Sequence, residues 1–116
     1  NRPLYNSIEY INNQPNMKAS LIDMNTFDVK ALDEVKKYHQ TYNMVFIDAG
    51  HRYDEVKNDI DKFSNLATDI LLFHDIRPIE KNDNCGVYQA IKDSNIVLDQ
   101  EISVADEMGI GIKFIK

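Results

Sequence analysis

The chain has 116 residues, of which 43% are hydrophobic and 28% charged, and its formal net charge is −6. This length allows one domain with a modest core. The acidic balance argues against a nucleic-acid surface, which needs a basic stripe, and no apolar run approaches the ~20 residues that span a bilayer. The only cysteine, Cys85, cannot form an internal disulfide. We therefore expect a cytoplasmic protein with neither a nucleic-acid nor a membrane partner.

The first part of the chain is predicted to form a helix, a strand and a second helix. Apolar residues recur with helical spacing between residues 4 and 11, and Pro15 follows as a helix breaker. Residues 17–24 are expected to form a strand whose acidic end is Asp23. Asp28 is a suitable N-cap for the second helix, whose apolar residues again have helical spacing.

Two short runs of apolar residues, 44–47 and 70–73, predict buried strands. Unbroken apolar runs are typical of strands that are buried on both faces of a parallel sheet. A helix is expected between them, over residues 54–67. In open α/β sheets the functional groups lie in the loops at the carboxyl ends of the strands. We therefore expect the acidic and imidazole residues that follow the two runs to share one site. These residues are Asp48, His51, His74 and Asp75.

The rest of the chain is predicted to contain a polar loop over residues 76–84, a helix from Gly86, a long or bulged strand within 96–105, a turn at 106–109 and a closing strand at 110–115. No helix separates the last two strands, so they are expected to pair as an antiparallel hairpin. The alternation of helices and strands elsewhere predicts an α/β, Rossmann-like three-layer sandwich. Its sheet would be mostly parallel, with helices on both faces.

The stretch FIDAGHRYDEVKND, residues 46–59, resembles the "FIDGDHSYEGVKAD" signature of class I S-adenosylmethionine-dependent methyltransferases. The similar subset includes macrocin-type O-methyltransferases and cephalosporin-hydroxylase-like proteins. Three further segments resemble its "VFHDI" element, its "GV..A" helix start and its closing "GLGIGV" strand. They are LFHDI at 72–76, GVYQA at 86–90 and MGIGI at 108–112.

The likeness covers residues 44–116 and implies one partial methyltransferase domain over residues 1–116. In that interpretation the fold is incomplete, because it lacks the N-terminal glycine-rich half that binds the methyl donor. The implied reaction is S-adenosylmethionine-dependent, Mg²⁺-assisted O-methyl transfer to the hydroxyl of a small molecule or sugar.

The resemblance also assigns roles to individual residues. It implies that Asp48 and Asp75 are metal ligands and that His74 stands where relatives have a carboxylate or a histidine. His51 matches the position of the general base in macrocin-type members, and Asp23 corresponds to a residue near the adenine of the methyl donor. Mg²⁺ prefers oxygen ligands, and an imidazole with a reference pKa of ~6.5 can accept a proton near neutral pH.

Simpler structural roles remain open for each of these residues. Asp48 could cap a helix, His51 could be a surface loop residue, His74 could pack at a strand end and Asp75 could belong to a turn. Two other functions also remain open. One is a non-catalytic binding or interaction module that retains the scaffold, and the other is metal-assisted hydrolysis at the same carboxylates.

The strand at residues 44–47 is expected to need a partner on its outer edge. The resemblance implies that two strands, which these residues do not provide, occupy that position in the complete fold. An unpaired apolar edge invites association. We therefore expect either residues 17–23 or another chain to pair with it, the latter giving a homo-oligomer through the exposed edge of the sheet.

Overall fold

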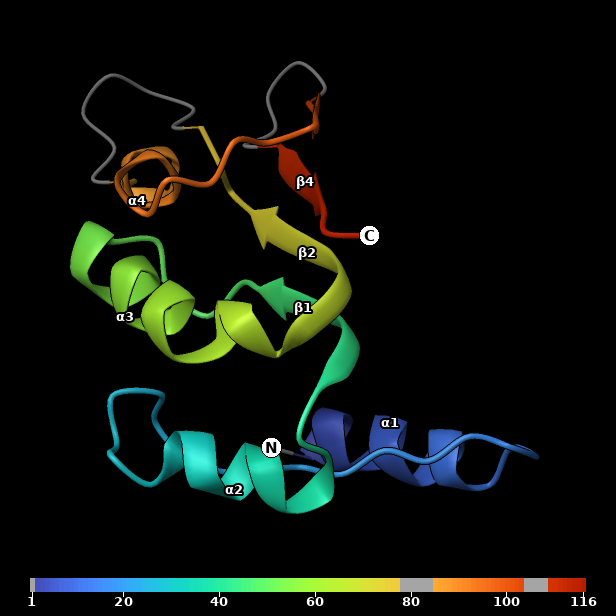
Figure 1. Ribbon diagram of the computed structural model, residues 1–116. Coiled ribbons are helices and arrows are strands. Elements are labelled where there is room, and N and C mark those ends of the chain that lie inside the picture. The colour runs from blue at the N-terminus through green and yellow to red at the C-terminus, as the bar shows by residue number, and fades with distance from the viewer. Residues whose placement is uncertain (1, 78–84, 104–108) are drawn as a thin grey trace.

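The computed structural model describes residues 2–77, 85–103 and 109–116, and it is a mixed α/β structure (Figure 1). The elements are α1 (Arg2–Asn12), α2 (Ala31–Tyr38), β1 (Tyr42–Ile47), α3 (Tyr53–Phe63), the short 3-10 helix η1 (Ser64–Leu66), β2 (Ala67–His74), α4 (Val87–Asp93), β3 (Gln100–Ile102) and β4 (Ile110–Phe114). The four predicted helices and both predicted strands are therefore confirmed, with small shifts at their ends, but the predicted burial of 44–47 on both faces is wrong, because Met44 and Phe46 are about half exposed. No helix in the described part of the chain is long and apolar enough to cross a membrane.

The described strands form one sheet in the order β1-β2-β4-β3. The pair β1 and β2 is parallel, as predicted, because helix α3 carries the chain back to the start of the sheet. The pairs β2–β4 and β3–β4 are antiparallel. The antiparallel pairing of the last two strands is thus confirmed. The prediction of a mostly parallel sheet is wrong for the described strands, because only one of their pairings is parallel.

Helices α3 and α4 pack against each other and cover the same face of the sheet (Figure 1). Val56 and Ile60 of α3, one helical turn apart, are 1% and 2% exposed. They meet Leu71 and Phe73, which alternate along β2 and are 3% and 0% exposed. Helices α1 and α2 lie beyond the β1 edge in Figure 1 and do not form a second covering layer. The described elements therefore do not make a clear three-layer sandwich.

The opposite face of the sheet is partly open to solvent. The side chains of Met44 and Phe46 on β1 are 53% and 48% exposed. Phe114 on β4 is 45% exposed, and it pairs through its backbone with Ile70 of β2. Cross-strand neighbours share a face, so these residues form a continuous apolar surface. The second helical layer predicted from the sequence would have covered it.

The strand predicted at residues 17–24 is absent. This segment forms neither a helix nor a strand. The side chain of Asn12 fixes its beginning: its Oδ1 accepts from the amide of Ala19 at 2.6 Å, and its Nδ2 donates to the carbonyl of Ala19 at 3.1 Å. The expected pairing of residues 17–23 with β1 is therefore wrong, and β1 is the edge strand of the described sheet.

The structure leaves part of the C-terminal predictions untested. The predicted loop at 76–84 and turn at 106–109 fall largely outside the described residues. The predicted strand at 96–105 is described as far as residue 103, and only Gln100–Ile102 is a strand. Residues 96–98 are not part of it, although Ile96 and Leu98 pack against the hydrophobic core.

Candidate metal centre at the carboxyl ends of β1 and β2

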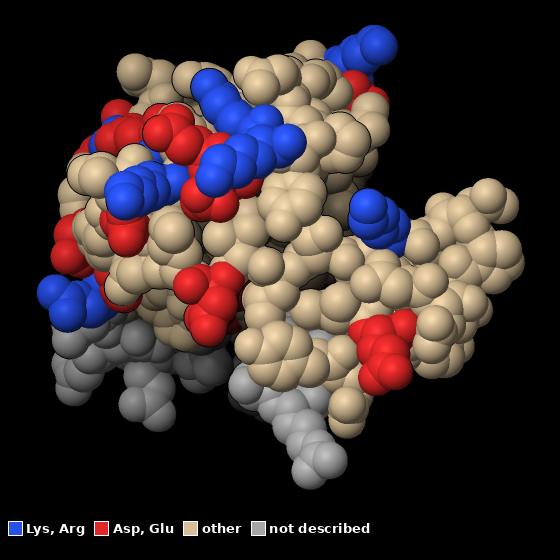
Figure 2. Space-filling model, turned by 90° about the horizontal axis from the view of Figure 1, so that it is seen from below, with Lys and Arg blue, Asp and Glu red and all other residues tan. Residues whose placement is uncertain are grey.

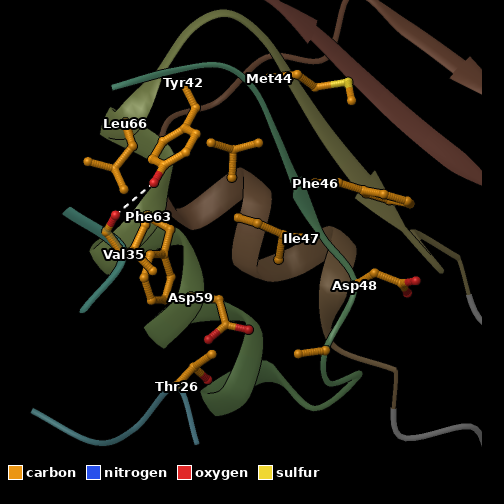
Figure 3. Close-up of a pocket in the computed structure, with 12 residues that line it drawn as sticks. Thr26, Val35, Tyr42, Met44, Phe46, Ile47, Asp48, Asp59, Phe63 and Leu66 are labelled. Carbon is orange, nitrogen blue, oxygen red and sulfur yellow. Dashed lines mark hydrogen bonds between the residues drawn. The ribbon is translucent and has the colours of Figure 1, made fainter. Parts of the chain in front are cut away.

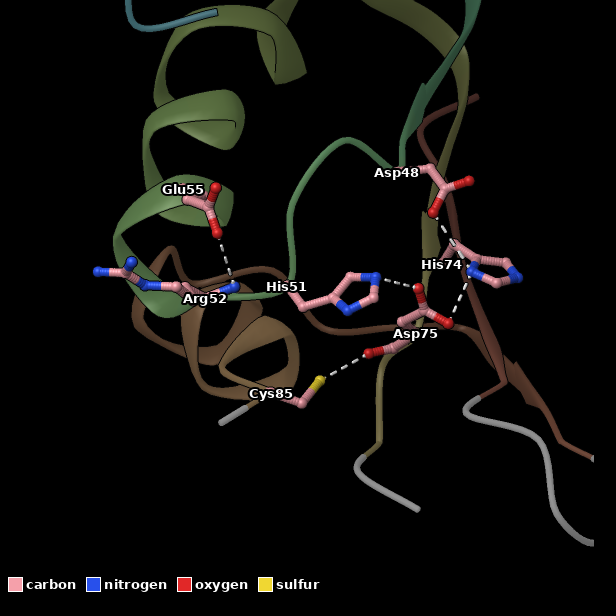
Figure 4. A network of polar contacts seen from close by, with 7 residues as sticks. All are labelled: Asp48, His51, Arg52, Glu55, His74, Asp75 and Cys85. Atoms are coloured by element: carbon pink, nitrogen blue, oxygen red, sulfur yellow. Dashed lines mark hydrogen bonds and ion pairs between the residues drawn. The ribbon is translucent and has the colours of Figure 1, made fainter. Parts of the chain in front are cut away.

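The parallel pairing of β1 and β2 brings Asp48 and His74 together. Ile47, the last residue of β1, pairs with Phe73. The next residue of each strand, Asp48 and His74, therefore lies at the same edge of the sheet. This confirms the prediction that the residues after the two apolar runs lie close together at one edge of the sheet. Figure 4 shows Asp48, His74 and Asp75 pointing toward one another.

His74 lies between two carboxylates. Its Nδ1 is 2.8 Å from Oδ1 of Asp75 and 3.3 Å from Oδ1 of Asp48. One potential ligand atom from each of the three residues lies within 4.8 Å of the others. Half of the Asp48 side chain is accessible, at 46%, whereas that of Asp75 is only 12% exposed. The group is therefore buried at Asp75 and accessible to solvent at Asp48.

Asp75 has a backbone conformation that is uncommon for a residue with a side chain. Its φ is +58°, in the left-handed region, which aspartate and asparagine tolerate better than most residues. Two contacts hold it: its amide donates to the carbonyl of Gly109 at 2.9 Å, and its own carbonyl accepts from Sγ of Cys85 at 2.9 Å. The chain turns sharply at Asp75, so consecutive residues, His74 and Asp75, both face the same site.

His51 approaches Asp75 from the loop between β1 and α3. Its Nε2 lies 2.6 Å from Oδ2 of Asp75, while half of its side chain remains exposed. The carbonyl of His51 accepts from the amide of Gly86 at 2.7 Å. A Cβ on Gly86 would lie 2.5 Å from the amide nitrogen of Tyr53, so only glycine permits this approach. The start of α4 thus supports the His51 loop.

The three residues fit a divalent cation. Carboxylate oxygens suit Mg²⁺ and Mn²⁺, and an imidazole nitrogen adds affinity for Mn²⁺, Fe²⁺ or Zn²⁺. Asp75 also has the support that metal ligands usually have, because its second carboxylate oxygen is in contact with His51. Asp48 has room on its solvent side for waters or for a substrate oxygen.

Asp23, the predicted contact of the methyl donor, is exposed in the segment before α2 and is not a member of the Asp48/His74/Asp75 group. The support for Asp75 could not be predicted from the sequence, because nothing in the spacing of Cys85 and Gly109 indicates that both contact the backbone of Asp75.

A polar contact between α3 and α4 stabilises the helices next to the site. The hydroxyl of Tyr53 donates to Oδ2 of Asp93 at 2.8 Å, and Nε2 of Gln89 donates to the other oxygen at 2.7 Å. These hydrogen bonds lower the pKa of Asp93, and the bond to Asp93 raises the pKa of Tyr53.

Comparisons of this chain with models of protein families, with curated proteins and with solved structures find no match. The functional assignment therefore depends on the geometry of the Asp48/His74/Asp75 group and on the short motifs around it.

Proposed function

We propose that Asp48, His74 and Asp75 bind a divalent cation and that His51 serves as the general base beside it, in S-adenosylmethionine-dependent O-methyl transfer. The observation that carries the proposal is the convergence of the three ligand atoms at the ends of two parallel strands. Two carboxylates and one imidazole with an open side offer the kinds of ligand atom that a divalent cation takes.

A bound cation would lower the pKa of a coordinated hydroxyl and fix its position for reaction. Each of the surrounding residues would have a separate role. Asp75, mostly buried, anchors the site, and Asp48 lies at its solvent side. The contact of Asp75 with Nε2 of His51 orients the imidazole toward the same space. His51 is exposed enough to receive a proton from a substrate hydroxyl and pass it to water.

The methyl-transfer part of the proposal depends on the resemblance of residues 46–59 and 72–76 to the methyltransferase signature. In this proposal S-adenosylmethionine is the methyl donor, and a small molecule or sugar is the acceptor. Asp23 contacts the methyl donor. The alternative is a binding module with the same scaffold. The N-terminal glycine-rich segment that the resemblance requires is not among these 116 residues, which favours this alternative for the chain by itself.

The metal site is tested by calorimetric titration of Mn²⁺ and Mg²⁺ into the chain, with the Mn²⁺ electron paramagnetic resonance signal as a second measurement. We expect one site, and we expect Asp75→Asn to weaken it by at least about 100-fold. Asparagine is the sharpest replacement because it also tolerates the left-handed backbone of Asp75.

Asp61→Asn is the matched control. Asp61 is an exposed acid on α3 that pairs with Lys57 one turn away, and such pairs contribute little to stability. Its replacement removes the same charge without touching the site. Absence of a stoichiometric site in the unchanged protein would overturn the metal assignment. Equal loss in both variants would show that the binding is only nonspecific attraction to negative charge.

The methyl donor is tested separately, by titration of S-adenosylmethionine with and without Mn²⁺. Binding that strengthens in the presence of the metal supports methyl transfer. A chain that binds the metal but not S-adenosylmethionine would favour the non-catalytic module.

A further inference from the structure

The candidate metal centre contains a nitrogen donor, which an ordinary Mg²⁺ site does not need. Mg²⁺ is bound through oxygen, usually by one or two carboxylates and several waters. Imidazole nitrogen instead suits Zn²⁺, Fe²⁺, Ni²⁺ and Cu²⁺. The imidazole of His74 lies in the middle of the group, because its Nδ1 is close to a carboxylate oxygen of both Asp48 and Asp75. The ligand set therefore matches a transition-metal ion better than Mg²⁺, the ion that the methyltransferase resemblance implies.

The two distances from this nitrogen agree with the spacing of ligands around one ion. Two ligands at right angles, each about 2.1 Å from an octahedral ion, lie about 3.0 Å apart. The distances from Nδ1 of His74 to Oδ1 of Asp75 and Oδ1 of Asp48 are 2.8 and 3.3 Å, on either side of this value. Nδ1 and the two oxygens are therefore spaced as neighbouring ligands of one ion.

The ring of Phe46 holds the imidazole of His74 in this orientation. Met44 and Phe46 of β1 and Asp48, which follows the strand, point to the same side of it (Figure 3). The Phe46 ring meets the His74 ring edge-on, with centroids 6.2 Å apart and an interplanar angle of 66°. A ligand whose orientation is fixed by packing loses less conformational freedom when the ion binds. The nitrogen is therefore prepared to act as a ligand.

Within the described part of the chain, no other group of three histidine, cysteine or acidic side chains has ligand atoms this close. Asp59, the other buried acid of the described residues, accepts a hydrogen bond from Nδ2 of Asn58 at 3.1 Å and belongs to no such group. Asp61 is paired with Lys57 at 2.7 Å. Figure 2 shows one face of the molecule, where acidic side chains lie among lysines and arginines. A transition-metal ion should therefore prefer the Asp48/His74/Asp75 group.

We propose that His74 makes this centre selective for a transition-metal ion such as Fe²⁺, Co²⁺ or Zn²⁺ over Mg²⁺, through a bond from Nδ1 to the ion. The carboxylates of Asp48 and Asp75 serve either kind of ion, so the nitrogen is the selective ligand. Such an ion also activates a coordinated hydroxyl. This inference rests on the cation site of the proposed function but not on methyl transfer.

The first test detects the nitrogen directly and needs no variant. Mn²⁺ is the probe, because pulsed electron paramagnetic resonance of its unpaired electrons reports coupling to a bound nitrogen. We expect this coupling when the protein holds Mn²⁺. It should persist in His51→Gln, because His51 is not one of the three ligand residues, and it should disappear in His74→Asp. Bound Mn²⁺ without nitrogen coupling, or coupling that only His51→Gln removes, would overturn the inference and leave the cation site in place.

The second test compares two ions in one pair of proteins. Calorimetric titration of Co²⁺ and Mg²⁺ gives the ratio of their dissociation constants. His74→Asp replaces the nitrogen with a carboxylate oxygen, so we expect the preference for Co²⁺ over Mg²⁺ to fall by at least about tenfold. The added negative charge attracts both ions, and the ratio largely cancels this effect. An unchanged ratio would overturn the selective role of His74.

His39→Asp is the matched control. His39 is exposed directly after α2, and its ring contacts that of Tyr42, which lies at the opposite end of β1 from Asp48. The same substitution there should leave the ratio unchanged. An equal fall in both variants would overturn the inference, because added charge alone would then explain it. Binding of neither Co²⁺ nor Mn²⁺ to the unchanged protein would overturn the inference together with the cation site on which it rests.

Discussion

Nε2 of His51 lies 2.6 Å from Oδ2 of Asp75, so the loop after β1 is in contact with the residue that follows β2. The other oxygen of the same carboxylate is 2.8 Å from Nδ1 of His74. Asp75 therefore connects the proposed general base to the proposed metal site. Because both imidazoles contact this one carboxylate, the two proposed roles are coupled, and they are distinguished by the size of the effect of each mutation.

We expect His51→Gln to lower the affinity for Mn²⁺ by about tenfold, which is less than the loss expected for Asp75→Asn. The reason is that His51 supports a ligand but lies outside the group of three ligand residues. Calorimetric titration of the variants under identical conditions measures the difference. If His51→Gln removed binding as completely as Asp75→Asn does, His51 would itself be a ligand.

We expect Gly109→Ala to destabilise the protein by about 1–3 kcal/mol and to weaken Mn²⁺ binding at the proposed metal site. Gly109 has a φ of +84°, and an added Cβ would lie 3.0 Å from the carbonyl oxygen of Ile102. Its carbonyl also accepts the amide of Asp75. Urea unfolding and Mn²⁺ titration test the two effects.

Gly109→Asn provides the comparison, because asparagine adopts positive φ more readily than alanine. It should cost less stability than Gly109→Ala if the backbone conformation is the main cause. Equal losses would instead identify contact with Ile102 as the cause.

Tyr53→Phe is expected to raise the pKa of Asp93 toward its ordinary value, because the hydrogen bond from Tyr53 is the largest cause of the lowered pKa. A carboxyl whose pKa is lower in the folded state stabilises the protein above its unfolded pKa. That contribution disappears as the pH falls through the folded pKa. The variant should therefore be slightly less stable at neutral pH and should approach the original protein in acid.

An NMR titration of the Asp93 carboxyl carbon measures the pKa, and urea unfolding at neutral and acidic pH measures the stability. Gln89 also donates to Asp93, so the variant should retain part of the shift. An unchanged pKa would show that the contact between Tyr53 and Asp93 is not maintained in solution.

Phe73→Ala should destabilise the protein by about 3–5 kcal/mol, because it leaves a cavity beneath α3 and α4. Phe73 is 0% exposed and belongs to the buried cluster between the helices and the sheet. Val97→Ala, at an exposed position, should change stability by less than about 0.5 kcal/mol. Urea unfolding provides both values, and a small effect at Phe73 would contradict the described core.

The sequence was sufficient to predict the two strands that carry the site. The apolar runs at 44–47 and 70–73 were long enough for strands and too short for separate helices. A helical pattern between them required a parallel crossover, and a crossover places both carboxyl ends at one edge. The meeting of Asp48 with His74 and Asp75 followed from these two local patterns.

The strand predicted at residues 17–24 shows where such patterns fail. A short apolar segment can form a strand only if a neighbouring strand accepts its hydrogen bonds. The side chain of Asn12 holds Ala19 instead, and Ser20 and Ile22 line a cavity together with Tyr42 of β1. That strand would have added a second parallel pairing to the sheet, beside the two antiparallel ones.

By itself, the sequence determined the local elements and the order of acidic and imidazole residues at their ends, because periodicity and helix signals act over a few residues. Only the tertiary structure decided the left-handed turn at Asp75, the contact of His51 with its carboxylate and the burial of Asp59. Each of these depends on residues distant in the chain, such as Gly109 and Gly86, and a local pattern contains no information about such partners.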